Sequence, residues 1–547
     1  MPTDAKTDII GSYQYTTERP LLSFITLSYN RPTLLLETFK SFQKQTLPNW
    51  EWIVIDGSAL PLTNAIRQIL LDRRVHVYRS EGNEISRLWN FGIQRCHGVY
   101  VNIHDDDNLK APTFVEKVVA FMEANPTYVG CASYWNVIDA EGKVVGERAP
   151  FSVASITPEA LRNENCVDGG AAVYRKEILE AFHGYDTKLN TSEDWDMIIR
   201  ATSMGTIGIL PEYLHMYRSG IPRRSDNAGA LGRIKDEKYF LHKSNWRIQI
   251  VPPPESAMTF SQKENVRHIT EALKSLQMVD VVETKPDCVL FPAPFLTSEE
   301  TIKRVAESNK NAKLVTLHME DPPAIGVNKE RAKLVHAVIT NDISVKEEYE
   351  TIVGKGRVLI YPNLLIPNGI NHSFLPLSSR ARHKVYVGYP YPSRVAIAKE
   401  LITRFGEKGV LFVGDGWDKY TSNSIPTKSY METLELMRSS WVVLCSERVP
   451  GDGGGGKGQF QSLHRGYAEC AGGNPIINLV SPEQTHHMFS DEIIQVLDTK
   501  EMIEQIELII SNPSLHNYHS MKVRRGIARF SFKTILTRIL NDLQEMK

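Results

Sequence analysis

Residues 98–108 read GVYVNIHDDDN and join an apolar run to three consecutive acids. The run from Gly98 to Ile103 predicts a buried strand, so Asp105 to Asp107 stand where that strand ends. Like charges this close repel one another, and they persist most readily beside a cation. A hard divalent ion such as Mg²⁺ or Mn²⁺ takes carboxylate oxygens and shares its remaining positions with phosphates. The stretch therefore predicts a metal and phosphate site; the alternative is an acidic, solvated turn.

An alternating pattern of strands and helices surrounds this stretch. Residues 21–27 and 50–55 are apolar runs that predict strands, and apolar residues recur at helical spacing through 34–42 between them. Residues 84–95 predict another helix, which leads into the strand before the acids. In such βαβ units, ligands bind beyond the carboxyl ends of the strands. The sequence therefore predicts an α/β fold in which the ends of several strands form one rim around the acids.

The composition limits the classes of protein that fit. At 547 residues the chain is too long for one core and predicts about three or four folding units. Lysine and arginine number 63 against 64 acids, which argues against binding nucleic acid through bulk charge, although a local basic groove stays open. We find no signal peptide, no apolar run that would span a bilayer and no paired cysteine spacing, so we expect a cytoplasmic protein with reduced thiols.

Six separated motifs in the first 220 residues resemble those of the family 2 glycosyltransferases, which have the GT-A fold. The resemblance covers residues 20 to 220, and it is specific because the motifs occur in the family's order. The motifs are ITLSYNRP at 25–32, VIDGS at 54–58, NFG at 90–92, DDD at 105–107, GGAAVYRK at 169–176 and SEDWD at 192–196.

The resemblance implies a metal-dependent, inverting transfer from a nucleotide-diphosphate sugar, with UDP-sugar as the expected donor. Asp194, with Glu193 beside it, would be the general base that deprotonates the acceptor hydroxyl. Residues 193–196 can also be explained as an acidic helix N-terminus capped by Ser192, which does not exclude catalysis. Mn²⁺ or Mg²⁺ would be held by Asp105, Asp107 and His215, although a structural role for the histidine is equally open. The residues expected to bind the donor are Thr26, Ser28, Asn30, Asp56, Arg87, Asp105 and Asp106.

The chain departs from the family pattern on both sides of the acids. His104 precedes them in place of an apolar residue, and Asn108 stands where the family has a last acid. The departure leaves metal binding in place but leaves the choice between the two ions open.

A second α/β region is predicted beyond a proline-rich linker at 251–255. Its motifs resemble those of the CgeB-like spore-maturation glycosyltransferases, which have the GT-B fold of two Rossmann-like lobes. The match spans residues 285 to 480 and is less specific than the first. Its motifs are EDPP at 320–323, ITND at 339–342, PNGIN at 367–371, VGYPYPSR at 387–394, VGDGW at 413–417 and SLHRGYAECAGG at 462–473.

The second resemblance implies another donor site. Glu469 would accept hydrogen bonds from the ribose hydroxyls, although an ion pair with Arg465 competes with that role. The glycine-rich loop 451–458 would let backbone N–H groups approach a phosphate, and a flexible surface loop is the alternative. The expected donor-binding residues of this half are Gly388, Arg394, Gly414, Gly416, Lys457, Arg465 and Glu469.

The predicted organisation therefore has five parts. Residues 490–547 predict helices, and the basic amphipathic stretch 521–530 suits either a membrane surface or packing on the domain. The predicted spans are an N-terminal arm at 1–20, a GT-A domain at 21–222, a helical connector and linker at 223–255, a first GT-B lobe at 256–378, and a second GT-B lobe with C-terminal helices at 379–547.

We interpret the sequence as a bifunctional glycosyltransferase of polysaccharide biosynthesis, in which one domain adds a sugar to the product of the other. The acceptor would be a glycan, either free, lipid-linked or protein-linked. Three alternatives stay open: an inactive GT-B half that only binds the acceptor, an enzyme that acts on modified DNA, and a non-catalytic scaffold.

Overall fold

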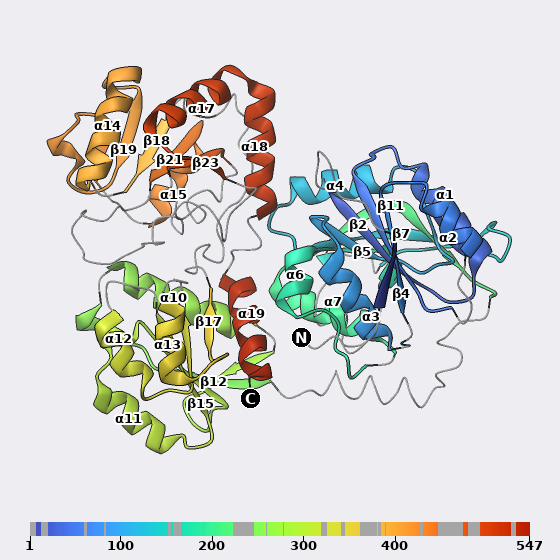
Figure 1. Ribbon diagram of the computed structural model, residues 1–547, viewed down its shortest axis with the longest axis horizontal. Helices are drawn as coiled ribbons and strands as arrows, with labels where there is room; N and C mark the ends of the chain where they lie inside the picture. The colour runs from blue at the N-terminus through green and yellow to red at the C-terminus, as the bar shows by residue number, and fades with distance from the viewer. Residues whose placement is uncertain are drawn as a thin grey trace. The chain divides into compact units, whose positions relative to one another are not determined.

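The computed structural model divides into two compact units, residues 1–244 and 245–547 (Figure 1). We describe each unit by itself. The division falls inside the span predicted as the connector. The structure describes residues 7–11, 20–58, 63–80, 82, 84–150, 155–156, 161, 166–189, 191–221, 245–258, 260–276, 278–318, 325–340, 345–361, 380, 384–388, 390–426, 430–446, 474–479, 493–526 and 532–546.

Four parallel strands form the centre of the N-terminal unit, in the order β4, β3, β2, β5. They span Val75–Ser80, Trp50–Asp56, Leu22–Ser28 and Tyr100–Ile103. Nearly every residue of these strands is buried, because helices cover both faces of the sheet. The strands predicted from the apolar runs are confirmed, and their carboxyl ends form the expected rim.

Among the described residues, seven further strands make this a mixed sheet of eleven. Strand β10 runs antiparallel to β5 and β7, and β11 runs parallel to β7. β1, which lies in the predicted arm, pairs antiparallel with β4. The bounds are Thr7–Gly11 for β1, Leu109–Lys110 for β6, Gly130–Ile138 for β7, Val144–Arg148 for β8, Ser155–Ile156 for β9, Ala172–Arg175 for β10 and Ile207–Arg218 for β11.

Two sets of helices cover the sheet (Figure 1). The helices α1, α2 and α4 bury their apolar side chains with the main core cluster on one face. On the other face α3 contacts β2, β3 and α6, and α6 contacts α7. The helices span Pro32–Gln43 for α1, Thr63–Ile69 for α2, Ile85–Arg95 for α3, Phe114–Ala124 for α4, Lys176–Ala181 for α6 and Glu193–Met204 for α7.

Aromatic side chains fill the core on the face of α1. Phe24 of β2 stacks on Phe42 of α1 with 4.0 Å between the ring centroids, and Trp50 and Trp52 of β3 pack around Phe42. All four are fully or almost fully buried. Because offset and edge-on aromatic contacts add to the burial of apolar area, this cluster fixes α1 against the strand that leads to the rim.

The second unit begins with a sheet of six parallel strands, in the order β13, β12, β14, β15, β16, β17. β12 lies inside the span predicted as the connector, but it pairs within this sheet. The strands span Trp246–Ile250 for β12, Val279–Val281 for β13, Cys288–Pro292 for β14, Lys313–His318 for β15, Ala337–Thr340 for β16 and Val358–Ile360 for β17. The helices are Phe260–Ser275 for α10, Glu299–Ser308 for α11, Ile325–Ala332 for α12 and Lys346–Val353 for α13.

A second parallel sheet follows, in the order β20, β19, β18, β21, β22, β23. Counted along the chain this order is 3-2-1-4-5-6, and open sheets of this kind bind ligands where the order reverses, here between β18 and β21. The strands span Lys384–Val387 for β18, Val410–Val413 for β19, Ser424–Ile425 for β20, Val442–Ser446 for β21, Ile476–Leu479 for β22 and Ile494–Val496 for β23. The helices are Pro392–Phe405 for α14, Tyr430–Arg438 for α15, Thr499–Ser511 for α17 and Pro513–Gly526 for α18.

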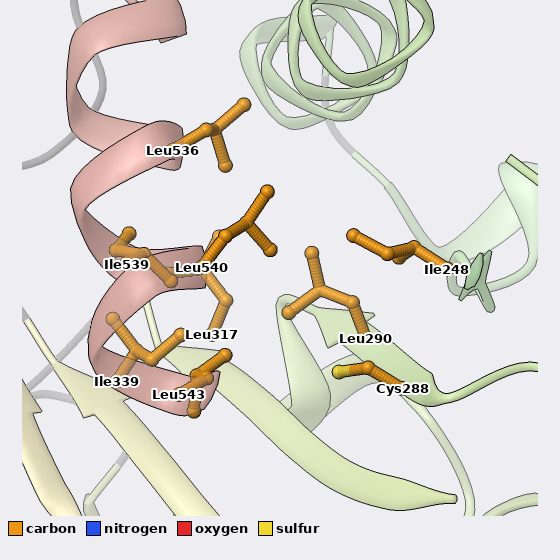
Figure 2. Close-up of a pocket in the computed structure, with 9 residues that line it drawn as sticks. All are labelled: Ile248, Cys288, Leu290, Leu317, Ile339, Leu536, Ile539, Leu540 and Leu543. Carbon is orange, nitrogen blue, oxygen red and sulfur yellow. The ribbon is translucent and has the colours of Figure 1, made fainter. Parts of the chain in front are cut away.

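The last helix, α19 (Phe532–Glu545), packs on the first of these two sheets and on α10. Lys313 Nζ donates to the carbonyl oxygen of Leu543 at 2.6 Å and ties the end of the helix to β15. Figure 2 shows the apolar pocket at this contact, which is lined by Ile248, Cys288, Leu290, Leu317, Ile339, Leu536, Ile539, Leu540 and Leu543. By its packing, α19 therefore belongs with the first sheet, although its sequence follows the second.

The described part of the C-terminal tail departs from the predicted helices at one place. Residues 490–547 were predicted to be helical, but Ile494–Val496 form the edge strand β23, so the prediction is wrong there. In the part of the chain that the structure describes, no helix combines the length and the apolar character needed to cross a membrane. The described cysteines are all free thiols, as predicted.

Candidate functional site

The three acids lie at the carboxyl end of β5, as the sequence predicts. The backbone N–H of His104 donates to the carbonyl oxygen of Ile25 at 2.8 Å, so the pairing with β2 continues up to the acids. Asp105 is exposed, whereas Asp106 and Asp107 are buried. The buried carboxylates therefore need partners inside the protein, while Asp105 faces solvent.

Arg31, in the loop after β2, supplies positive charge to both buried acids. Its Nη1 atom lies 2.7 Å from Asp107 Oδ2 and 3.2 Å from Asp106 Oδ1. Asp106 also accepts hydrogen bonds from Ser28 Oγ at 3.1 Å and from the backbone N–H of Tyr29 at 3.3 Å. Burial raises the pKa of Asp106 to about 6, and the charge of Arg31 opposes that rise. Asp106 and Ser28, both predicted to contact the donor, thus join the β2 loop to the acids.

Asn108, which departs from the family pattern, orders the acid cluster from the other side. Its Nδ2 donates to Asp105 Oδ2 at 3.1 Å, and its Oδ1 accepts from the backbone N–H of Arg218 at 2.8 Å. The side chain of Arg218 is buried and donates to the carbonyl oxygens of Asp107 and Ala140 at 2.8 and 2.6 Å. An acid at position 108 could not donate to Asp105, because an ionised carboxylate has no proton to give. The asparagine can therefore link Asp105 to the backbone of Arg218, whereas an ionised acid could not.

A second group of predicted donor residues lies at the end of β3. Asp56 is fully buried; its Oδ1 accepts from the backbone N–H of Ser58 at 3.0 Å, and its Oδ2 lies 3.0 Å from Arg79 Nη1. Asn30 has φ of 58° and donates its backbone N–H to Ser58 Oγ at 2.8 Å. These contacts bring the predicted residues Asn30 and Asp56 together around Ser58. Sequence reasoning missed Arg79, whose partner is 23 positions away.

Two other predicted donor residues make local contacts. Thr26 is fully buried, and its Oγ1 accepts a hydrogen bond from Trp52 Nε1 at 2.8 Å, which is a contact inside the sheet. Arg87 forms an ion pair with Glu84 at the start of α3 and is partly exposed. The structure thus places Thr26 inside the sheet and pairs Arg87 with the residue three positions before it.

The predicted base Asp194 and its neighbour Glu193 occupy the first turn of α7, and both are half-buried. The Oδ1 atom of Asp194 accepts from the backbone N–H of Trp195 at 2.8 Å. A Cβ added to Gly169 would lie 3.1 Å from Asp194 Oδ2, so the backbone there runs directly against the carboxylate. Ser192 was expected to cap the helix, but it has φ of 58° and makes no capping hydrogen bond with its side chain. The acids still suit the positive end of the helix dipole.

His215 of β11 was expected to bind the metal, and the structure surrounds it with other partners. It is fully buried, with Nε2 3.0 Å from Asp168 Oδ1 and Nδ1 3.3 Å from Lys110 Nζ. Burial and the neighbouring Lys110 lower the pKa of His215 to about 4, so the ring is neutral at pH 7. Burial likewise lowers the pKa of Lys110 well below its ordinary value. Because both ring nitrogens of His215 face these groups, the structure favours a structural role for His215 over the expected role as a metal ligand.

The remaining acids fit a divalent ion only in part. Among the described residues, no three His, Cys, Asp or Glu side chains form a complete metal-binding group. Mg²⁺ commonly takes one or two carboxylates from the protein, with its other ligands from substrate phosphates and water. Asp105 and Asp107 offer the hard oxygen ligands for such a partial site, and the pairing of Arg31 with Asp107 shows that positive charge is stabilised there. These two carboxylates therefore fit part of the coordination of the predicted ion, and donor phosphates and water would supply the rest.

In the second unit the structure brings four predicted donor residues together at the carboxyl ends of β18 and β19. Arg394, in the first turn of α14, is buried, and its Nη2 donates to the carbonyl oxygen of Ser446 at 2.9 Å, which links the start of α14 to the end of β21. Gly388 has φ of +139°, and a Cβ added to it would lie 2.5 Å from Arg394 Nη1. Gly414, with φ of +149°, packs its backbone against Gly388, and Gly416 has φ of +89°. Because all three glycines have positive φ, a residue with a Cβ atom would strain the backbone at each of these positions.

The other three residues predicted for this site are Lys457, Arg465 and Glu469. They lie outside the described residues, together with the glycine-rich loop 451–458.

Comparison with known proteins finds glycosyltransferases that are similar to the N-terminal unit. Residues 23–182 match the model of glycosyl transferase family 2. An uncharacterized glycosyltransferase, MJ1057 of Methanocaldococcus jannaschii, is 29% identical over 245 residues, which are 42% of this chain and 81% of that protein. The putative teichuronic acid biosynthesis glycosyltransferase TuaG of Bacillus subtilis is 34% identical over 113 residues, 20% of this chain and 44% of that protein.

A solved structure shows a low level of similarity to part of the chain. It is S. aureus TarS, residues 1–349, in complex with UDP, with 17% identity and a TM-score of 0.31 over 37% of this chain and 61% of that one.

Proposed function

We propose that the N-terminal unit moves a sugar from a nucleotide-diphosphate donor to a hydroxyl group of a glycan or glycoconjugate. The match of residues 23–182 to glycosyl transferase family 2, together with the glycosyltransferase relatives, makes the protein a transferase enzyme. The observation that carries the proposal is that β5 joins two groups of carboxylates. Asp105–Asp107 follow the strand, and Asn102 within it donates to the carbonyl oxygens of Gly170 and Ala172 at 2.8 and 2.7 Å. Gly170 is next to the glycine that Asp194 touches.

In the proposed reaction Asp194 takes the proton of the acceptor hydroxyl. The acceptor oxygen then bonds to the anomeric carbon of the donor, while the bond from that carbon to the diphosphate oxygen breaks on the opposite side. The nucleoside diphosphate leaves with the electron pair, and the configuration of the sugar inverts. The two products, the nucleoside diphosphate and the lengthened acceptor, are the readouts that test this proposal.

A divalent ion completes the proposed donor site. Asp105 and Asp107 would hold Mn²⁺ or Mg²⁺, and the bound ion would supply positive charge that stabilises the leaving diphosphate. Asp106 would keep its structural role, since it links the β2 loop to the cluster through Ser28 and Arg31. By analogy with the family's uracil contact, Asp56 would hold the base of the nucleotide, and the proposed donor is accordingly a uridine diphosphate sugar.

For the second unit we propose a second sugar transfer at the carboxyl ends of β18 and β21. The strand order reverses there, and open parallel sheets bind their ligands at that position. Arg394 is held at this point by Ser446 and lies against the backbone of Gly388, so we expect backbone and positive charge to meet a diphosphate here. The GT-B fold predicted from the sequence would supply the same arrangement. A module that binds the acceptor without reacting is the alternative.

Replacing Glu469 by alanine separates these two interpretations. Each charge-assisted hydrogen bond to a ribose hydroxyl contributes roughly 1.5 to 3 kcal/mol, so donor affinity of the second unit should fall at least about tenfold. The reaction of the first unit should not change, because Glu469 belongs to the other compact unit and substitutions without shared partners act independently. Full-length Glu469→Ala should therefore stop after one sugar, and mass spectrometry of the products should show the shorter intermediate.

The matched control for that experiment is Glu504→Ala, which removes an exposed carboxylate from α17 of the same unit. It should give the wild-type product. If Glu469→Ala also made the complete product at the wild-type rate, the second unit would be the binding module.

A further inference from the structure

In the large sheet of the N-terminal unit, the second half of β7 and the neighbouring strand β8 are partly exposed to solvent. In β7 the residues from Gly130 to Ser133 are buried, whereas those from Tyr134 to Val137 are half-buried. The neighbouring strand β8 is mostly exposed. Tyr213 of β11 exposes 39% of its surface. Aromatic side chains that remain exposed together often mark a surface that binds a partner.

The register of the strands shows on which face these tyrosines lie. β10 pairs with β7 so that Ala172 is opposite Ala132 and Tyr174 is opposite Gly130. Opposed residues share a face, and side chains alternate along a strand, so Tyr134 lies on the face of Tyr174. Burial and the nearby charge of Asp194 raise the pKa of Tyr174, which places this face beside the first turn of α7. Tyr134 is therefore on the same face as the proposed base.

Four side chains on this face form one patch, which we call the tyrosine platform: Tyr134, Asn136, Glu147 and Tyr213. The rings of Tyr134 and Tyr213 meet edge to face, with centroids 5.4 Å apart. Glu147 is exposed and forms a hydrogen bond with the hydroxyl of Tyr213. Asn136 pairs with Glu147 across β7 and β8, so their side chains are neighbours. Flat aromatic surface thus lies beside an amide and a carboxylate.

The platform connects to the proposed active site through the short helix η1 (Gly169–Ala171). This helix contacts both β7 and β11. At its first residue the backbone runs against Asp194. His215, which is opposite Trp135 in the ladder, holds Asp168 at the N-cap of η1. The same strands that carry the tyrosines therefore also fix the segment that touches the base.

We propose that the tyrosine platform binds a sugar unit of the acceptor chain next to the unit that reacts at Asp194. The proposal rests on the glycosyl transfer proposed for this unit. Tyrosine rings offer flat apolar area to the C–H face of a pyranose, while Asn136 and Glu147 hydrogen-bond with ring hydroxyls. A carboxylate at the edge disfavours an anionic acceptor, so the fitting ligand is a neutral oligosaccharide of at least two sugar units.

The test uses the full-length protein and a panel of fluorescently labelled neutral oligosaccharides of one to six units. Wild type should bind chains of two or more units more tightly than single sugars. Tyr213→Ala should weaken that binding about tenfold and leave donor affinity unchanged. Tyr213→Phe keeps the ring and should restore most of the affinity. Tyr518→Ala removes a tyrosine that is 44% exposed in α18 and serves as the control.

Three outcomes would overturn the platform. In the first, wild type and Tyr213→Ala bind every oligosaccharide with equal affinity. In the second, the affinity of wild type does not depend on the length of the oligosaccharide. In the third, wild type releases nucleotide from its donor but binds no oligosaccharide of the panel. None of these affects the proposed transfer, which fails only if no nucleotide sugar reacts. If Tyr213→Ala unfolds at a lower temperature than wild type, Glu147→Gln and Tyr213→Phe are compared with wild type instead. We expect both variants to lose less affinity for the oligosaccharides than Tyr213→Ala.

Discussion

Asp194→Asn is expected to lower the rate of sugar transfer by about two to four orders of magnitude, the usual range for the loss of a positioned general base. The amide keeps the shape of the carboxylate, so its contacts with Gly169 and the backbone of Trp195 can persist. It cannot accept the proton of the acceptor hydroxyl. Donor affinity, measured by titration of the nucleotide sugar, should stay near that of wild type.

Glu193→Gln is the matched comparison, because this residue is half-buried in the same helical turn. It should cost much less activity if Asp194 is the base. A collapse of donor affinity in Asp194→Asn would instead make Asp194 a binding residue. A larger loss in Glu193→Gln would exchange the two assignments.

Asp107→Ala is expected to reduce transfer by the N-terminal unit to background, and excess chelator should do the same to wild type. The physical reason is that Asp107 is one of two carboxylates proposed to hold the ion that neutralises the leaving diphosphate. In the variant, Arg31 keeps its contact with Asp106, so the loop after β2 retains an anchor. Rates measured in chelator and after adding back Mn²⁺ or Mg²⁺ test the expectation.

Glu141→Ala, which removes an exposed carboxylate from the turn between β7 and β8, is the control and should retain full activity. Undiminished transfer in excess chelator would contradict the metal assignment, as would an active Asp107→Ala protein.

The parts of the fold that the sequence predicted are those encoded by long apolar runs. Strands β2, β3 and β5 and helix α3 lie close to their predicted bounds, because each buries nearly all of its apolar side chains. The edge strand β23 was missed, since three residues are too few for an alternating pattern to be visible. Residues 223–244 of the predicted helical connector lie outside the described residues.

The candidate site divides in the same way. The position of the acids was predictable, because their strand precedes them directly in the sequence. The partners of His215 were not, since Lys110 and Asp168 come from other segments and meet the histidine only in the folded sheet. Arg31 belonged to a recognised motif, yet only the structure shows its contact with Asp107, 76 positions away. Long-range ion pairs of this kind leave no periodic signal.

The proposed sugar transfer is tested by measuring the release of nucleoside diphosphate from a panel of nucleotide sugars by the full-length protein, with a divalent ion and a mixture of glycan acceptors. We expect at least one donor, a uridine diphosphate sugar, to yield nucleoside diphosphate and a glycosylated acceptor in equal amounts. We expect Asp194→Asn to lose both products together. The proposed mechanism would be contradicted if wild type neither bound nor consumed any nucleotide sugar. It would also be contradicted if Asp194→Asn formed both products at the wild-type rate.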